Sequence, residues 1–293
     1  MISEKRTEDL KWKLRLGTFG VYAVLIFAVV LVLGPLYIVL VTSFMDKSQA
    51  MSPTFALWPD DFNLHGYIEV FTYTSGGGDT IPTVVRGFIN TMITVIPTTV
   101  VGTLISALSA YAFAKIRFNG SRFLFSVLIG TMMIPGTITL IPSYIIFDRI
   151  GWTDTFLPLV VPGLLGSAST VFFLRQFYYA IPDDLLEASR VDGLSNMGAF
   201  FKIILPLSVP ALVSQLILNF VTGYNAYLGP LLYLFSPEKY TLQIALNFFR
   251  GTYQTDYAVI MAGAIVSLLP TTLMYLIGQR YFLEGIATSG MKL

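Results

Sequence analysis

The sequence predicts an all-α, polytopic membrane protein with six transmembrane helices, and two observations support this fold class. Of the 293 residues, 55% are hydrophobic and only 12% are charged, which is about half the charged fraction of a typical soluble domain. The chain also contains six uncharged apolar stretches, each long enough for the roughly 20 helical residues that cross a bilayer. These stretches are Phe19–Phe44, Gly87–Ala114, Phe123–Phe147, Thr155–Leu174, Ile203–Leu228 and Tyr257–Gly278.

The first stretch, Phe19–Phe44, is expected to remain in the protein as a membrane anchor. It is too long for the core of a secretory signal peptide, and no small-residue cleavage pattern follows it. Prolines in or beside the later stretches, such as Pro97, Pro135 and Pro210, remove backbone donors and predict kinked helices.

The distribution of Lys and Arg predicts that both chain termini lie in the cytoplasm, because these residues favour that side of the membrane. With the N-terminus inside, only five of the eighteen lie outside, namely Lys47, Arg86, Arg149, Lys239 and Arg250. The predicted organisation is a cytoplasmic segment 1–18, a six-helix domain 19–280 with an inner loop at about 176–204, and a cytoplasmic tail 281–293. This tail is too short and glycine-rich to form a helix of its own.

Several kinds of chemistry are excluded by residues that the sequence lacks. There is no cysteine and only one histidine, His65, which we interpret as a solvated loop residue; no metal site and no catalytic residue are predicted. No charged residue lies well inside a span, whereas gradient-driven transporters usually bury such residues. The phosphate-binding motif G-x-x-x-x-G-K-[ST] is absent, and no basic stripe suggests nucleic acid. Uphill transport would therefore require a separate nucleotide-binding subunit.

The inner loop before the fifth stretch predicts two short helices joined by a sharp bend. Asp183 is placed to cap the first helix, and Glu187 suits the positive N-terminal end of that helix. Gly193 can adopt the left-handed conformation that ends a helix, and Ser195 can cap the next one. The loop offers apolar contacts at Leu185, Leu186, Ala188, Val191 and Leu194. It fits either docking into a partner's groove or an ordinary loop on the membrane surface.

The same stretch resembles the signature of binding-protein-dependent ABC importer permeases, E-A-A-x3-G-x9-I-x-L-P. The sequence supplies Glu187-Ala188-Ser189, then Gly193, Ile203 and Leu205-Pro206 at the matching spacing, with Ser189 in place of the second alanine. Residues 57–67, 224–233 and 279–292 further resemble the oligosaccharide-importing branch, and within it the shorter, maltose-type permease.

The resemblance implies a heteromeric complex. In this family two permease subunits form the pathway, two ATPase subunits bind ATP and Mg, and an extracytoplasmic binding protein delivers the solute. This chain itself would bind no cofactor and would lie, surrounded by lipid, in the plasma membrane of a prokaryote, which is the inner membrane if the cell is Gram-negative. The residues expected to transmit motion from the ATPases are Glu187, Ala188, Ser189, Asp192 and Gly193.

The most polar stretch in any predicted span is 219–227, and it is the candidate pathway segment. The pathway candidates are Asn219, Thr222, Tyr224, Asn225 and Tyr227. On a helix, Asn219, Thr222 and Ala226 would share one face. Amides can hydrogen-bond sugar hydroxyls, and tyrosine rings offer apolar faces. Alternatively, these groups bond the partner permease, and the pathway follows Thr131–Tyr144.

Two alternative functions are left open by the sequence. The chain could be a permease of the same class for another solute, or it could be a gradient-driven transporter or channel. Arg86, Arg149 and Arg250 on the predicted outer side would suit an acidic oligosaccharide, but they also fit ordinary surface positions.

Overall fold

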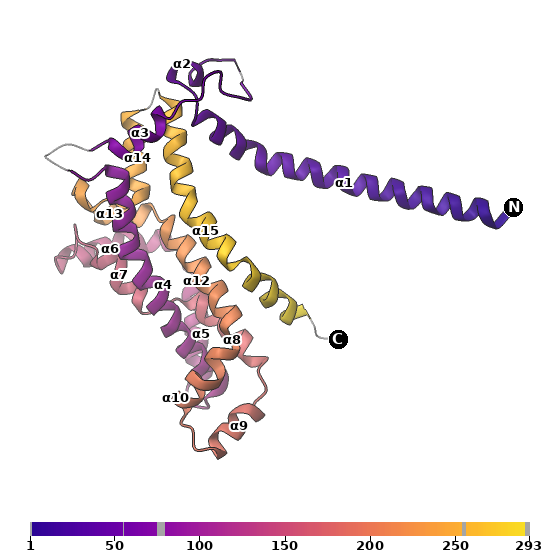
Figure 1. Ribbon diagram of the computed structural model, residues 1–293. Helices are drawn as coiled ribbons and strands as arrows, with labels where there is room; N and C mark the ends of the chain where they lie inside the picture. The colour runs from indigo at the N-terminus through magenta and orange to yellow at the C-terminus, as the bar shows by residue number, and fades with distance from the viewer. Residues whose placement is uncertain (1, 55, 75–79, 254–255, 291–293) are drawn as a thin grey trace. The chain divides into compact units, whose positions relative to one another are not determined.

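The computed structural model describes residues 2–54, 56–74, 80–253 and 256–290, and the regular elements among them are all helical (Figure 1). The longer helices are α1 (Ile2–Thr42), α4 (Thr83–Lys115), α5 (Ser121–Met132), α6 (Gly136–Arg149), α8 (Ala168–Tyr179), α12 (Val209–Tyr224), α14 (Leu242–Thr252) and α15 (Tyr257–Gly290). The shorter helices are α2 (Lys47–Ala50), α3 (His65–Thr72), α7 (Leu157–Leu164), α9 (Asp184–Val191), α10 (Asn196–Ala199), the π-helix η1 (Phe200–Ile204), α11 (Leu205–Leu207), α13 (Leu228–Tyr233) and the 3-10 helix η2 (Pro237–Lys239).

The candidate membrane spans correspond to the six predicted stretches. Four regions are long and apolar enough to cross a bilayer, and they are Gly20–Thr42, Thr83–Lys115, Leu157–Tyr179 and Tyr257–Tyr281. The third and fifth predicted stretches are bent helix pairs. Ser121–Met132 and Gly136–Arg149 meet at 96°, and Asn196–Leu207 and Val209–Tyr224 meet at 80°. The described residues therefore hold four to six spans.

Prolines account for the two sharp bends. Pro135 directly precedes α6 with φ −60° and lacks the N–H that would continue the preceding helix. Ser208 lies at the second bend, between Pro206 and Pro210. The predicted kinks are confirmed at these places, whereas Pro97 lies inside the unbroken helix α4.

The end of the chain differs from the sequence-based expectation. The residues after Arg280, expected to form no helix of their own, continue α15 as far as Gly290. Adding residues to an existing helix avoids the cost of nucleating a new one, so a short glycine-containing tail can remain helical. Residues 291–293 of the predicted tail and Met1 of the segment 1–18 lie outside the described residues.

The chain divides into two compact units. The smaller unit holds the chain up to Thr72 together with Arg250–Val266, and the larger unit holds Tyr73–Phe249 and the chain from Ser267. In the smaller unit, Nε2 of His65 lies 3.5 Å from Oδ2 of Asp256, a side chain that is only 5% exposed. The His65 side chain is 41% exposed, in agreement with a solvated residue, but it begins helix α3 rather than lying in a loop, and its ring also faces a buried carboxylate.

In the larger unit, α4 is the central helix and packs against α7, α8 and α12. Small side chains on α4 permit this close approach. A Cβ atom added at Gly102 would collide with the carbonyl oxygen of Gly163, and the Ser106 hydroxyl accepts a 3.0 Å hydrogen bond from the backbone N–H of Ser167. The backbone of the α7–α8 connection therefore lies directly on α4.

The larger unit also contains a buried apolar core, which includes residues of the predicted inner loop. Its buried members are Ala107, Ala110, Tyr111, Val171, Leu174, Tyr178, Ile181, Leu186, Ala199, Phe200, Ile204, Ala211 and Leu212. Because α9, α10 and η1 each contribute a side chain, the loop is part of the packed structure rather than a free connection.

Candidate functional site

The two-helix loop at 176–204 forms much as its sequence predicts. Helix α9 ends at a left-handed Gly193, whose φ is +81°. The N–H of Gly193 donates to the carbonyl of Arg190, and the N–H of Leu194 donates to the carbonyl of Ser189, at 3.0 and 2.9 Å. This is the Schellman arrangement, which satisfies the last carbonyls of a helix. Ser195 then caps α10 by accepting a 3.1 Å hydrogen bond from the N–H of Gly198.

The start of α9 differs from the predicted cap. Asp183 occupies the N-cap position, but its side chain makes no capping hydrogen bond. Its Oδ1 atom instead accepts a 2.6 Å hydrogen bond from Nζ of Lys115, at the end of α4. The same ammonium donates to the carbonyl of Ile181, also at 2.6 Å. The hydrogen bond and charge of Lys115 lower the pKa of Asp183 below its usual value, with smaller contributions from Arg117 and Arg190.

The candidate coupling residues lie on two sides of α9. Glu187, Ala188, Asp192 and Gly193 are exposed. Ser189 is 3% exposed, and its hydroxyl donates to the carbonyl of Leu186 at 2.7 Å. A serine fits at this position because its hydroxyl is satisfied within its own helix.

The apolar side chains of the loop are divided between the buried core and the exposed surface. Leu186 is buried in the core of this chain, so it does not contribute to an apolar docking surface as we had expected. Leu185 and Val191 remain exposed, at 43% and 87%. One side of α9 thus packs on the larger unit, and the other is open.

The predicted pathway segment 219–227 does not form one helical face. Helix α12 ends at Tyr224, with Asn225 as its C-cap, so Ala226 and Tyr227 lie beyond the helix. Asn219 donates hydrogen bonds to Thr103 on α4 and Thr170 on α8, at 3.0 and 3.2 Å. This amide connects three helices of this chain, whereas the alternative drawn from the sequence was a bond to the partner permease.

The other pathway candidates have different surroundings. Tyr224 is 1% exposed, and its hydroxyl donates to the carbonyl of Ser267 at 2.8 Å. Thr222 and Asn225 are exposed, and both bond to carbonyls of their own helix. Tyr227 is half-buried. Only Thr222 and Asn225 are therefore open to solvent, lipid or a partner subunit.

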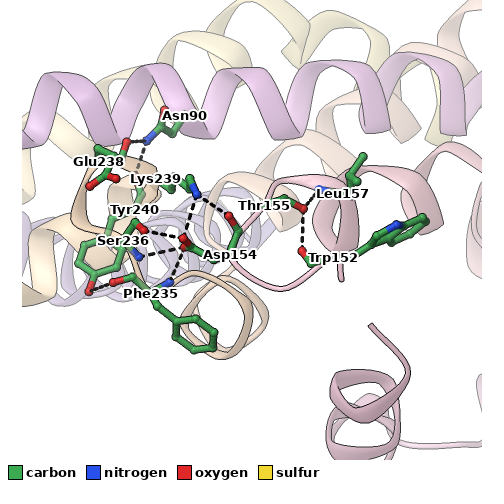
Figure 2. A network of polar contacts seen from close by, with 10 residues as sticks. All are labelled: Asn90, Trp152, Asp154, Thr155, Leu157, Phe235, Ser236, Glu238, Lys239 and Tyr240. Carbon is green, nitrogen blue, oxygen red and sulfur yellow. Dashed lines mark hydrogen bonds and ion pairs between the residues drawn. The ribbon is translucent and has the colours of Figure 1, made fainter. Parts of the chain in front are cut away.

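A polar network around Asp154 was not predicted from the sequence. Figure 2 shows the Asp154 carboxylate facing Phe235, Ser236 and Lys239. It accepts hydrogen bonds from the N–H groups of Phe235 and Ser236 at 3.0 Å and from Nζ of Lys239 at 2.8 Å. The sequence offered a single signal, which is the position of an aspartate just before a span. In the structure Asp154 has a positive φ of 55°, a conformation that aspartate adopts more readily than most residues.

The Asp154 network joins two connections of the larger unit. Partial burial acts to raise the pKa of Asp154, but the Lys239 ammonium and the donors of Ser236 and Phe235 outweigh it and hold the pKa well below its usual range. Nearby, Asn90 on α4 donates to the carbonyls of Glu238 and Tyr240, both at 2.9 Å (Figure 2). The connection after α13 is thereby fixed to both α4 and the loop before α7.

No group of three His, Asp or Glu side chains in the described part of the chain is arranged to hold a metal ion. The chemistry that this arrangement offers is hydrogen bonding between packed helices.

Comparisons with known proteins agree over most of the chain. The sequence profile described as "Binding-protein-dependent transport system inner membrane component" matches residues 102–286. The arabinooligosaccharides transport system permease protein AraQ of Halalkalibacterium halodurans is 29% identical over 99% of this chain and 100% of its own length. The sn-glycerol-3-phosphate transport system permease protein UgpE of Pectobacterium atrosepticum is 30% identical over 92% of this chain and 95% of its own.

A solved structure has the same fold. One chain in the crystal structure of a bacterial ABC transporter involved in the import of the acidic polysaccharide alginate superposes with a TM-score of 0.77. The match covers 91% of the chain described here and 96% of that chain, at 23% sequence identity.

Proposed function

Because this chain belongs to the family of binding-protein-dependent transport system inner membrane components, we propose that it forms, together with a second permease, the pathway of an ATP-driven importer for a sugar. The chain is a multi-pass membrane protein of the ABC permease fold. Its family membership decides against the gradient-driven transporter or channel that the sequence had left open.

The observation that carries this proposal is the bent helix pair α9–Gly193–α10. It places Glu187, Ala188 and Asp192 on an open surface, while Leu186 and Phe200 anchor the same loop in the core. A helix pair that packs in the core on one side and is exposed on the other suits docking into the groove of another subunit. We assign the exposed residues Glu187, Ala188, Asp192 and Gly193 to the contact with the ATPase subunits, and these four together with the buried Ser189 to the transmission of motion. None of these five residues would take part in the hydrolysis reaction itself.

The partners and the orientation follow from this assignment. The loop and both termini lie in the cytoplasm, where two ATPase subunits bind ATP and Mg. The connections near Asp154 and Tyr240 lie on the opposite side, where a binding protein delivers the solute. The chain itself contributes no catalytic group to ATP hydrolysis.

An oligosaccharide is the proposed solute, because a relative that aligns over nearly the whole chain is named for arabinooligosaccharides. A phosphorylated polyol is the second candidate, since another relative is named for sn-glycerol-3-phosphate. The two differ in charge, so a competition experiment can separate them.

The proposal is tested by reconstituting the complete complex in vesicles with its binding protein. We expect uptake of radiolabelled arabino-oligosaccharides that depends on ATP and on the binding protein, with little competition from sn-glycerol-3-phosphate. Strong competition would favour the phosphorylated polyol. Uptake that continues without ATP, in vesicles that retain the ATPase subunits, would contradict the assignment to an ATP-driven importer.

A further inference from the structure

A small cavity in the larger unit carries an inference beyond the coupling loop. It has a volume of about 90 Å³ and lies among α4, α7, α12 and α13. Its polar lining consists of Thr91, Thr94, Thr98, Tyr224 and Thr241, and apolar side chains complete it. No charged side chain lines the cavity within the described ranges of the chain.

Thr241 is the unusual member of this lining. It is 4% exposed, and its hydroxyl has no hydrogen-bond partner among the described residues. The backbone beside it is fixed, because the N–H of Leu242 donates a 2.9 Å hydrogen bond to Oγ1 of Thr91. A buried hydroxyl that bonds to nothing costs free energy, and the large majority of buried polar groups have a hydrogen-bond partner in the protein or in ordered water.

The threonines of α4 add hydrogen-bond acceptors. The Thr94 hydroxyl donates to the carbonyls of Asn90 and Thr91 at 3.2 and 3.0 Å, and the Thr98 hydroxyl donates to those of Thr94 and Val95 at 3.0 Å. A hydroxyl that already donates keeps lone pairs for accepting. The cavity therefore offers one group that can both donate and accept, together with two that can accept.

The geometry points to a binding site for neutral hydroxyl groups in this cavity. A hydroxyl both donates and accepts, which matches the Thr241 side chain and the acceptors on α4. A carboxylate or an ammonium does not fit, because the lining supplies no opposite charge to offset the loss of hydration. The apolar remainder, including Val95, Leu159 and Pro230, suits the C–H groups that accompany hydroxyls in a polyol.

Two sources could supply these hydroxyl groups. A water molecule needs about 10–15 Å³ of such volume, so the cavity has room for several waters or for the hydroxyl-bearing edge of a sugar. The second source rests on the proposed function in sugar import. It is favoured by position, because Tyr224 and Ala226 of the predicted pathway segment line the same cavity.

Radiolytic hydroxyl-radical labelling of the purified complete complex tests whether the site is occupied. The hydroxyl radical forms by radiolysis of water, so a buried tyrosine is labelled quickly only when a water molecule lies against it. We expect Tyr224 to be modified at least fivefold faster than Tyr111, which is also buried but packs on Phe200 outside the cavity. Labelling of Tyr224 should fall in Thr241→Val, which has the same shape, and persist in Thr241→Ser. Equal, slow labelling of Tyr224 and Tyr111 in the unaltered protein would overturn the proposal.

A second measurement distinguishes the two sources. If sugar hydroxyls enter, arabinotriose will protect Tyr224, and Thr241→Val will raise the KM of arabinotriose uptake severalfold while Thr241→Ser will not. If Tyr224 is labelled with no protection and an unchanged KM, the bound hydroxyls belong to water. A complex that imports no sugar would defeat the proposed function and leave the labelling result standing, so the two failures can be told apart.

Discussion

Lys115 and Asp183 lie 68 residues apart in the sequence, yet Nζ of Lys115 approaches Oδ1 of Asp183 to 2.6 Å. The Lys115 side chain is only 4% exposed, whereas Asp183 is 74% exposed. The ammonium also donates to the carbonyl of Ile181, so a buried charge is satisfied by two acceptors from the turn that precedes α9. The end of α4 is thereby joined to the start of the proposed coupling helix.

The first prediction concerns this junction. Lys115→Met should fill a similar volume, but it leaves the Ile181 carbonyl without its donor and releases Asp183 to solvent. We expect an assembled complex in which ATP hydrolysis is at least threefold less stimulated by the binding protein, because α9 can move without α4. The measurement is ATPase activity of reconstituted complexes with and without binding protein.

Arg117→Met supplies the matched control, because Arg117 lies two residues away and is exposed. It should retain normal stimulation. Equal stimulation in the Lys115 and Arg117 variants would show that the junction does not carry the motion.

The second prediction concerns the bend at Gly193. A Cβ atom there would meet no other atom within 4 Å, so the effect of a side chain arises from the backbone alone. At φ +81°, Gly193→Val should cost roughly 1–3 kcal/mol and disturb the angle between α9 and α10. Gly193→Asn should be tolerated better, because asparagine accepts the left-handed conformation.

We expect the valine variant to assemble but to transport poorly, with ATPase activity no longer dependent on the binding protein. The asparagine variant should keep much of its transport. Normal uptake by the valine variant in reconstituted vesicles would disprove a coupling role for the bend.

Much of this loop was predictable because its determinants are local. The glycine after α9 and the serine before α10 specify their own caps, and hydrophobic length specifies the spans. The contact of Asp183 with Lys115 was not predictable, because it joins residues that are distant in the sequence. The same holds for Asp154, whose partners Ser236 and Lys239 are brought to it only by the packing of α7 and α13.

The prediction that residues 219–227 form one helical face was wrong for a different reason. A helical face was predicted by extending regular spacing through 219–227, but α12 ends at Tyr224. After Tyr224 the helical hydrogen-bond pattern is replaced by a turn, in which the N–H of Ala226 donates to the carbonyl of Gly223 at 3.1 Å. No proline or glycine directly after Tyr224 marks this end in the sequence.

The third prediction concerns the packing of α4. Because a Cβ atom at Gly102 would collide with the Gly163 carbonyl oxygen, Gly102→Ala should push the α7–α8 connection away. Overpacking of this kind typically costs about 1–3 kcal/mol. The thermal midpoint of the purified complex should fall by several degrees. Gly130→Ala is the control, since no atom lies near its added Cβ, and a similar fall in that variant would contradict the explanation.

The fourth prediction concerns the charge of Asp154. Its pKa is lowered in the folded protein, so the network contributes stability above the unfolded pKa of about 3.9 and loses it as the pH falls toward the folded value. Asp154→Asn keeps the backbone conformation but removes the charge that bonds Lys239, and hydrogen bonds to charged groups contribute roughly 1.5–3 kcal/mol.

The variant should therefore unfold at a lower temperature than the unaltered protein by an amount that is constant between pH 5 and 8 and shrinks below about pH 4. Asp148→Asn provides a comparison, because Asp148 is exposed and accepts a single 3.1 Å side-chain hydrogen bond from Thr153. A difference for Asp154→Asn that disappears between pH 8 and pH 5 would be inconsistent with a lowered pKa.

The fifth prediction concerns the segment 219–227 and uses the absence of cysteine from the natural sequence. Single cysteines at Thr222 and Asn225, which are exposed and three residues apart, should react with a water-soluble thiol reagent applied from outside if they face a hydrated pathway. Cysteines at Ile217 and Phe220 of the same helix should be protected, because both side chains are buried and neither lines the cavity. A change in the reactivity of Thr222 and Asn225 with ATP would indicate that this surface opens during transport. If all four positions stay protected in every nucleotide state, the exposed pair must face lipid or the second permease, and the pathway has to be sought along Thr131–Tyr144.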